Sequence, residues 1–300
     1  MNSKYRSTML AALLPILLVA GCATAPGQST APTVPSARYV ALGSSFAAGP
    51  GVTVSADNPA TRCTRSKDNY AHQLARLRQL DLVDVSCGGA TTAHLLGPWK
   101  ELAPQLDALT PDTALVTITI GGNDVSYVGY LFVESCKGAE DRPALAKAFA
   151  MCKAMTARQP SFPAPAVPTD ADWSKLAADL DRIAAEARRR APQARIVFVD
   201  YVTLLPSGAP CPQVPLSGQA LATAQATADR LARLTASVAK HNGADVLRAS
   251  TLSRGHDACA AQPWSNGFVA RPGVDPFTPY HPNLAGMTAI ATALDRMLGR

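Results

Sequence analysis

Short apolar runs alternate with longer helical runs along this chain, and this alternation constrains its fold more than any other feature. The apolar runs carry many β-branched residues and no polar alternation, as in strands buried on both faces of a parallel sheet. The predicted strands are Tyr39–Leu42, Leu82–Ser86, Ala114–Ile120, Arg195–Tyr201 and Ala244–Leu247. The predicted helices are Tyr70–Leu80, Trp173–Arg190, Leu221–Asn242 and Leu284–Leu298. Right-handed crossovers place such helices on both faces, so we predict a three-layer α/β/α sandwich with a flavodoxin-like, parallel five-stranded sheet.

Four short polar segments lie at the ends of these predicted elements. Three of them follow predicted strands, and the fourth precedes the last helix. They are Gly43-Ser44-Ser45, Gly88-Gly89, Gly121-Gly122-Asn123-Asp124 and His281-Pro282-Asn283. Taken singly, each is an ordinary turn or helix-cap sequence. The carboxyl ends of strands in an open α/β sheet form the ligand crevice, so we expect the ordered set to converge on one site.

A serine and a histidine in this set supply the two parts that acyl transfer needs. A serine hydroxyl is a poor nucleophile until an imidazole accepts its proton, and that imidazole can then protonate the leaving alcohol. Ser45 and His281 fit this pair. The tetrahedral intermediate carries a negative oxygen, which preorganised amide donors stabilise. Gly89 and Asn123 are candidate donors, since a glycine lets the backbone approach the substrate closely.

The order of the four segments resembles the SGNH hydrolases, also called the GDSL esterase/lipase family, over nearly the whole mature chain. The resemblance implies that Ser45 is the nucleophile and His281 the general base. It also implies an oxyanion hole formed by the backbone amides of Ser45 and Gly89 and the side-chain amide of Asn123.

Two positions depart from the family pattern. Ser44 stands where the family has an aspartate, and we interpret it as a support position beside the nucleophile. Thr278 stands three residues before His281, where the family commonly has the aspartate that orients the imidazole. Either the backbone carbonyl of Thr278 or the displaced carboxylate of Asp275 is then left to hold the ring, and we favour the carbonyl.

The amino terminus predicts a compartment. Lys4 and Arg6 precede an apolar stretch, Met9–Ala20, that is short for a membrane span and leads into Gly21-Cys22. This pattern resembles a bacterial lipoprotein signal, which implies cleavage before Cys22, acylation of that residue and attachment to a membrane outside the cytoplasm. We therefore expect three parts: a signal peptide over 1–21, a flexible Pro-, Ala-, Ser- and Thr-rich tether over 22–37, and a hydrolase domain over 38–300.

The cysteine count agrees with that compartment. The chain has seven cysteines, and setting Cys22 aside leaves six, an even number suited to disulfides in an oxidising space. Six cysteines allow fifteen pairings, so the count alone does not choose. The resemblance to the secreted, three-disulfide branch of the family implies the pairs Cys63–Cys87, Cys136–Cys152 and Cys211–Cys259. The first pair would brace the chain beside the oxyanion hole.

Charge and histidine placement argue against other classes of function. The formal net charge is +6, and loss of Lys4 and Arg6 with the signal leaves 26 basic against 22 acidic residues, or +4. The basic residues form no dense patch, so we expect no nucleic-acid partner. The remaining histidines have no metal-ligand spacing and are expected to be structural or solvated: His72, His94, His241 and His256. We predict no metal and no cofactor.

The stretch from Ser126 to Thr169 is the expected source of substrate selectivity. Apolar residues follow the third segment directly, and some should line the acyl or alcohol pocket: Tyr127, Val128, Tyr130, Leu131 and Phe132. A cysteine-stapled, helix-like insert comes next. The proline-rich run Pro160–Pro168 is then either a rim over the crevice or a plain surface connection.

These observations predict a membrane-tethered, monomeric, serine-dependent carboxylic ester hydrolase that acts through an acyl-enzyme on acyl or lipid esters. An alternative is an esterase that removes O-acetyl groups from envelope or extracellular polysaccharide. A second alternative is a catalytically idle binding lipoprotein that keeps the fold, and Thr278 in place of an aspartate motivates it.

Overall fold

A computed structural model describes residues 36–140, 142–158, 167–274 and 277–299 of the chain. The strands are β1 (Arg38–Gly43), β2 (Asp81–Asp84), β3 (Thr113–Thr119), β4 (Arg195–Val199) and β5 (Asp245–Leu247). The α-helices are α1 (Ser45–Ala48), α2 (Tyr70–Arg78), α3 (Thr92–Leu96), α4 (Tyr127–Ala139), α5 (Ala146–Arg158), α6 (Asp170–Arg190), α7 (Gly218–His241), α8 (Ala249–Leu252) and α9 (Leu284–Leu298). Two 3-10 helices are η1 (Gln105–Ala108) and η2 (Pro143–Leu145).

Several sequence predictions fall outside the described residues. These are the signal segment, the acylated Cys22, the tether up to residue 35, the carboxylate of Asp275 and residues 160–166 of the predicted proline-rich rim.

The five strands form one parallel sheet in the order β2-β1-β3-β4-β5. Val40 of β1 lies opposite Val83 of β2 on one side and Val116 of β3 on the other. All neighbouring strands are parallel, which confirms the predicted flavodoxin-like sheet. Because the order reverses between β1 and β3, their carboxyl ends open a crevice at the switch point. Ser45 follows one of these two strands, and Asn123 follows the other.

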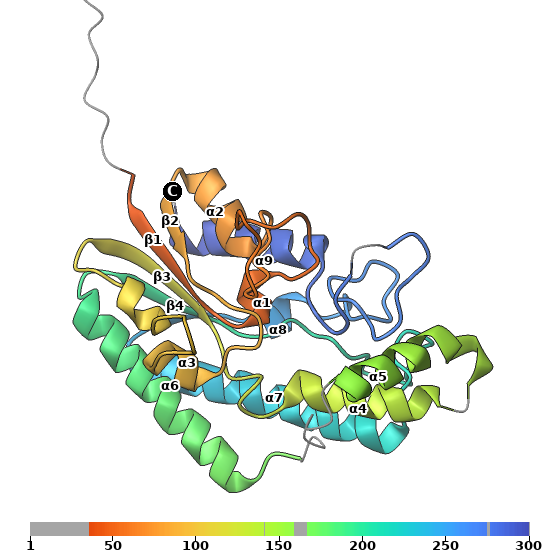
Figure 1. The fold of residues 1–300 in the computed structure, drawn as a ribbon. Helices are drawn as coiled ribbons and strands as arrows, with labels where there is room; N and C mark the ends of the chain where they lie inside the picture. Colours follow the sequence, from red (N-terminus) through yellow and green to blue (C-terminus); the bar gives the residue numbers. More distant parts are fainter. Residues whose placement is uncertain (1–35, 141, 159–166, 275–276, 300) are drawn as a thin grey trace, which may run out of the picture. The chain divides into compact units, whose positions relative to one another are not determined.

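Helices cover both faces of the sheet (Figure 1). Helices α2 and α9 pack against each other on one face, and α6 and α7 pack against each other on the other. The short helix α3 joins the second layer through its contacts with α6. This arrangement confirms the predicted three-layer sandwich.

Side-chain caps set the starts of α6 and α9. The sequence predicts a helix from Trp173, but α6 begins at Asp170 because the Thr169 hydroxyl accepts the Asp172 amide hydrogen and the Asp172 carboxylate caps the Thr169 amide in return. Three arginines occupy the last turn of α6, where the helix dipole favours cations. The α9 start is capped by the Asn283 side chain, which accepts from the Gly286 amide. This cap fixes the chain two residues after His281.

Two tyrosines of the core, Tyr39 and Tyr70, have paired hydroxyls. Tyr39 and Tyr70 are inaccessible to solvent, and their hydroxyls lie 2.7 Å from the Thr117 hydroxyl and 2.9 Å from the Thr119 hydroxyl, respectively. A buried hydroxyl without a partner would destabilise the fold, so the first pair fixes β1 against β3 and the second fixes α2 against the sheet.

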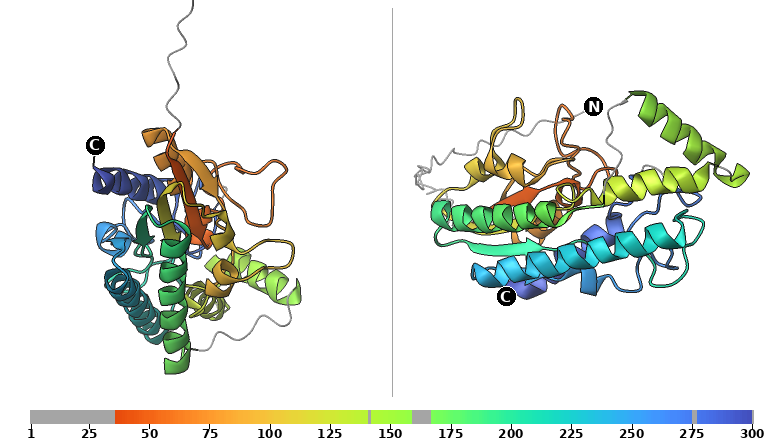
Figure 2. Two further views of the ribbon diagram at one scale, coloured as in Figure 1. Left: turned by 90° about the vertical axis from the view of Figure 1, so that its left-hand side faces the viewer. Right: turned by 90° about the horizontal axis from the view of Figure 1, so that it is seen from below.

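The insert after β3 forms a helical hairpin, α4–α5, whose first helix runs beside α7 (Figure 2). The Cys136–Cys152 disulfide joins its two helices, as predicted. Tyr127 and Leu131, which the sequence suggests as pocket-lining residues, are buried in the core instead. They lie on the face of α4 that packs inward. Over the part of the chain that the structure describes, no helix combines the length and the apolar character needed to span a bilayer.

Candidate active site

The proposed nucleophile lies where β1 meets its crossover. Ser44 occupies the N-cap position of the short helix α1, and Ser45 is the first helical residue. The Ser44 amide donates to the Thr119 carbonyl at 2.9 Å, which ties the turn to the end of β3. A side chain at Gly43 would lie 2.4 Å from that same carbonyl, so only glycine fits where the two strand ends converge. Sterics and this hydrogen bond together hold Ser45 at the crevice.

Gln105 fastens the turn from the other side. Its side-chain oxygen accepts the Gly43 amide hydrogen at 2.7 Å, and its side-chain nitrogen donates to the Gly43 carbonyl at 3.0 Å. Both backbone groups of the last β1 residue are thereby satisfied by one buried side chain. Gln105 is not among the residues that the sequence predicts for the site, because it lies 62 residues along the chain in a stretch without a recognisable motif.

Ser45 and His281 lie in hydrogen-bond contact. The Ser45 Oγ is 2.7 Å from His281 Nε2, although 236 residues separate the two in sequence. On the other side of the ring, Nδ1 is 2.7 Å from the Pro279 carbonyl oxygen. A carbonyl can only accept, so Nδ1 carries the proton and Nε2 presents a lone pair to the serine hydroxyl. This tautomer is the one that a general base requires.

The prediction that the Thr278 carbonyl orients His281 is wrong by one residue. The Pro279 carbonyl takes the Nδ1 hydrogen, while the Thr278 carbonyl accepts from the Asn266 side chain at 3.1 Å. The Thr278 hydroxyl donates to the Pro50 carbonyl at 2.8 Å and so anchors the loop instead. Tyr280 has a left-handed φ of 55°, which lets the loop turn back between Pro279 and His281. The principle of a backbone partner holds, and its position does not.

The imidazole of His281 is buried beside an aromatic ring. It is 8% exposed, and its centroid lies 5.0 Å from that of Phe46. Burial lowers the pKa of His281 to about 4, and the hydrogen bond to the Pro279 carbonyl partly opposes that decrease. The imidazole ring of His281 is therefore neutral at physiological pH.

The glycine segment after β2 reaches the same crevice. Gly89 has φ of 83°, a left-handed conformation that favours glycine, and its predecessor Gly88 donates to the Cys63 carbonyl at 2.9 Å. The predicted Cys63–Cys87 disulfide is present one residue before Gly88 and joins this segment to the loop after α1. A side chain at Gly89 would contact the ring of Trp99 at 3.4 Å.

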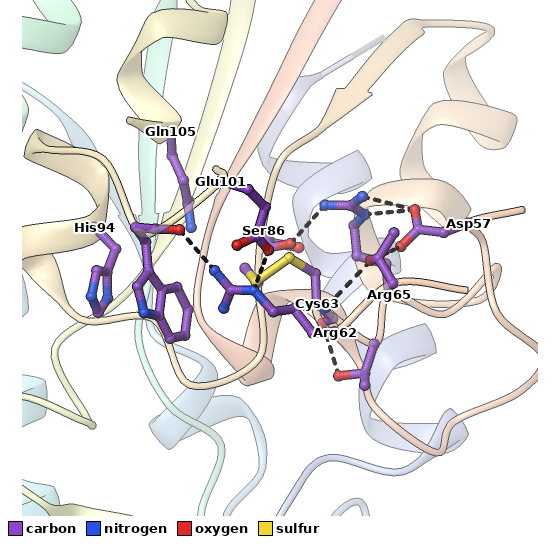
Figure 3. The surroundings of a disulfide bond; sticks show 12 residues. Asp57, Arg62, Cys63, Arg65, Ser86, His94, Glu101 and Gln105 are labelled. Carbon is purple, nitrogen blue, oxygen red and sulfur yellow. Dashed lines mark hydrogen bonds and ion pairs between the residues drawn. A yellow bond between two sulfur atoms is a disulfide. The ribbon is translucent and has the colours of Figure 1, made fainter. Parts of the chain in front are cut away.

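Charged residues around this disulfide hold the same loop (Figure 3). Arg65 pairs with Asp57 at 2.8 Å and also donates to the Ser86 carbonyl at 3.1 Å. Arg62 pairs with Glu101 at 2.7 Å and lies 4.0 Å above the Trp99 ring. The disulfide and the Arg65 hydrogen bond thus fasten the loop after α1 to the end of β2, and Arg62 fastens it to the segment that follows α3.

Asn123 and Asp124 attach the segment after β3 to the segment after β2. The Asn123 side-chain nitrogen donates to the Ala90 carbonyl at 2.8 Å. The Asp124 carboxylate accepts from the Thr92 amide at 3.1 Å and from the Thr92 hydroxyl at 2.5 Å. Burial raises the pKa of Asp124, with the Thr92 hydrogen bonds acting in the opposite direction. The two candidate donor segments are thereby fixed relative to each other.

Two other histidines, His94 and His256, make structural contacts. His94 Nδ1 accepts from the Thr91 amide in the α3 capping box, and its ring stacks on Trp99. His256 stacks on Trp264 with ring centroids 4.0 Å apart. Among the described residues, no group of three or more histidines, cysteines or carboxylates is placed to hold a metal ion.

The third predicted disulfide, Cys211–Cys259, is also present, so all three pairings are confirmed.

Comparisons with known proteins agree with this geometry. Residues 41–289 match the model of the GDSL-like Lipase/Acylhydrolase family. Lipase 2 of Streptomyces coelicolor is 32% identical over 92% of this chain and 89% of the relative. The crystal structure of an extracellular lipase from Streptomyces rimosus is 28% identical, with a TM-score of 0.64 over 87% of this chain and 99% of that chain. The fold is shared by phospholipase A1 from Streptomyces albidoflavus NA297. That structure is 23% identical, with a TM-score of 0.66 over 87% of this chain and 99% of that chain. The chain therefore belongs to the GDSL-like lipase/acylhydrolase family and is an enzyme of the esterase and lipase class.

Proposed function

We propose that this enzyme is a serine-dependent carboxylic ester hydrolase that works through an acyl-enzyme on acyl or lipid esters outside the cytoplasm. One observation carries the proposal: the 2.7 Å contact between Ser45 Oγ and His281 Nε2, with Nδ1 of the same ring bound to the Pro279 carbonyl. A nucleophile, a base in the right tautomer and a group that orients the base are the three parts of such a site.

The proposed reaction has two halves. In the first, His281 Nε2 accepts the Ser45 proton while Oγ bonds to the ester carbonyl carbon. The tetrahedral intermediate then collapses, the C–O bond to the alcohol breaks, and His281 returns its proton to the leaving oxygen. In the second half, His281 takes a proton from water, the resulting hydroxide attacks the acyl-enzyme, and the acid leaves as Ser45 regains its proton.

Three donors are proposed for the oxyanion. Within the described residues, the backbone amides of Ser45 and Gly89 have no hydrogen-bond acceptor, so both remain available to a ligand. The Asn123 side chain uses one N–H on the Ala90 carbonyl, and a carboxamide nitrogen carries two. Its second N–H is proposed to bind the oxyanion. Removal of one such donor typically lowers kcat by about 10²–10³.

The Pro279 carbonyl argues against an idle binding protein. The missing aspartate at position 278 motivates that alternative, but Nδ1 of His281 already has a partner. A carbonyl dipole fixes the tautomer and stabilises the imidazolium, although less strongly than a carboxylate does. Nothing else in the Ser45–His281 pair departs from working geometry.

A covalent probe tests the nucleophile directly. A fluorophosphonate should label the wild-type protein with one equivalent, and Ser45→Ala should lose all labelling. Ser44→Ala is the matched control, because Ser44 is the adjacent buried serine and its variant should still be labelled fully. Absence of labelling in folded wild-type protein would overturn the serine mechanism, and labelling of Ser45→Ala would assign the nucleophile elsewhere.

The relatives named as lipases support acyl or lipid esters as the substrate class. Rates on nitrophenyl butyrate and nitrophenyl palmitate, measured beside acetate release from an acetylated polysaccharide, decide between the two ester classes. Faster acetate release from the polysaccharide than from the matched soluble esters would favour the O-acetyl esterase.

An extracytoplasmic location is part of the proposal. Three disulfides suit an oxidising compartment. The sequence before Cys22, which resembles a lipoprotein signal, is proposed to direct acylation of that cysteine. Expression in a bacterial host with labelled palmitate should give an acylated protein that partitions into detergent. Cys22→Ser should remove both the label and the partitioning. An unlabelled wild-type protein in the medium would show a secreted enzyme instead.

A further inference from the structure

Tyr201 reaches the crevice from the end of β4, and the proposed mechanism gives it no role. It follows β4 by two residues and is 7% exposed. Its hydroxyl accepts the Gly122 amide hydrogen at 2.8 Å. A Cβ at position 122 would lie 2.8 Å from the Tyr201 ring and hydroxyl, so the glycine allows the phenol to approach the backbone closely.

This contact fixes the peptide that precedes the proposed oxyanion donor. The Gly122 amide is held by Tyr201, and the Gly122 carbonyl accepts from the Tyr127 amide at 2.8 Å. Asn123 follows directly, and its side chain is held at the far end by the Ala90 carbonyl. Tyr201 thus holds the backbone just before Asn123, and the Ala90 carbonyl holds the Asn123 side chain.

The same side chain also contacts the two residues that flank Ser45, which are Ser44 and Phe46. Its hydroxyl lies 3.5 Å from the Ser44 hydroxyl, beside the residue proposed to attack the ester. Its ring lies 4.5 Å from the Phe46 ring, centroid to centroid, and Phe46 packs against His281. Tyr201 is therefore in contact with the segments that follow β1 and β3, on which the nucleophile and the carboxamide lie.

We propose that Tyr201 is a positioning residue for ester hydrolysis, which acts by holding Gly122 so that the Asn123 carboxamide meets the oxyanion in the transition state. The inference rests on the proposed function. Because the tyrosine touches no reacting atom, its effect passes through Asn123. Burial raises the pKa of Tyr201, so its hydroxyl keeps its proton across the working pH range and takes no part as a base.

The test is Tyr201→Phe, which removes one oxygen and keeps the ring against Phe46. We expect kcat on a soluble nitrophenyl ester to fall roughly ten- to hundred-fold with KM changed less than about twofold, since a misplaced donor weakens the transition state alone. Tyr39→Phe is the matched control. Tyr39 is another buried tyrosine at the same sheet, its hydroxyl pairs with the Thr117 hydroxyl, and its loss should leave kcat within about twofold.

Two further measurements separate positioning from general destabilisation. All rates are expressed per fluorophosphonate-labelled site, so unfolded protein is not counted. In the Asn123→Ala background, Tyr201→Phe should lower kcat less than about twofold, because the group it positions is gone. The acid limb of the pH profile should not move, since His281 sets it.

Several results would overturn the inference. They are an unchanged kcat per labelled site in Tyr201→Phe, a rise in KM at constant kcat, or a full additional loss in the Asn123→Ala background. If Tyr201→Phe does not fold, Gly122→Ala displaces the same peptide by pressing on the ring and should show the same fall in kcat at constant KM. If the wild-type enzyme is labelled and active and these variants have the same kcat, the role of Tyr201 is contradicted. The serine mechanism is not affected by that result.

Discussion

The burial of His281 predicts an unusually acid-tolerant enzyme. In the proposed mechanism, activity requires the neutral imidazole, and burial lowers its pKa from the ordinary 6.5 to about 4. At pH 5 a base with a pKa of about 4 is roughly nine-tenths neutral, whereas a base with the ordinary pKa is roughly 3% neutral. The structure therefore predicts that kcat/KM at pH 5 stays near its neutral value, about thirtyfold above that expected for an exposed histidine.

The same low pKa of His281 makes the fold less stable as the pH falls from 6.5 to 4. The pKa of His281 is depressed in the folded state, so the unfolded chain takes up this proton near pH 6.5 and the native protein only near pH 4. Well above pH 6.5 neither state binds the proton, and stability is unaffected. Between pH 6.5 and 4 the free energy of unfolding should fall by about 3 kcal/mol from this group, because a tenfold change in proton affinity corresponds to about 1.4 kcal/mol.

The assay measures rate and folding side by side. Initial rates on a short nitrophenyl ester are taken from pH 3.5 to 8 at constant ionic strength, and the released phenol is read after an alkaline quench. Circular dichroism gives the folded fraction at each pH. We expect the acid limb of kcat/KM per folded molecule to be half-complete near pH 4. A midpoint near pH 6.5 in fully folded protein would refute the link between burial and basicity at His281.

Four variants test other parts of the site. Asp275→Asn should keep kcat within about threefold, because the Pro279 carbonyl already takes the Nδ1 hydrogen of His281; a loss near 10⁴-fold would assign orientation to the carboxylate. Asn123→Ala should lower kcat by about 10²–10³ with KM nearly constant, and a pure KM effect would contradict its place in the oxyanion hole. Replacing Cys63 and Cys87 by alanine should cost about 2–4 kcal/mol in denaturant unfolding and should also lower kcat per labelled site. Replacing Cys136 and Cys152 by alanine should lower the free energy of unfolding without lowering kcat per labelled site. Equal losses of kcat in both double variants would show that the first disulfide does not brace the site.

The layers of the fold were predictable because burial leaves a direct trace in sequence. The strand β3 is buried along nearly its whole length, and its sequence is a largely apolar run. Such a run is typical of a parallel sheet that is covered on both faces. Boundaries were less predictable, since they depend on caps. Helix α6 starts three residues upstream of Trp173 because Thr169 and Asp172 cap each other, and such a local exchange overrides the hydrophobic pattern.

Within the site, side chains with a chemical identity were predictable and backbone partners were not. Ser45 and His281 carry their chemistry in the residue type, and the sheet topology brings them together. The Pro279 carbonyl is a group that every residue has, so only the turn at Tyr280 decides which carbonyl reaches the ring. Gln105 and Tyr201 act on backbone amides from distant loops, and no local pattern marks such contacts.

The carbonyl partner and the deep burial of His281 form one electrostatic arrangement. A carboxylate on Nδ1 would stabilise the imidazolium in the resting enzyme, whereas a carbonyl in a buried site leaves the resting ring neutral. In the proposed mechanism, the imidazolium then forms only when the oxyanion forms, and each charge stabilises the other. The proposed amide donors of Ser45, Gly89 and Asn123 stabilise the negative member of that pair. Catalysis at this site is therefore expected to depend more on the oxyanion hole than it does in an aspartate-oriented triad, so the loss from Asn123→Ala should lie at the upper end of its predicted range.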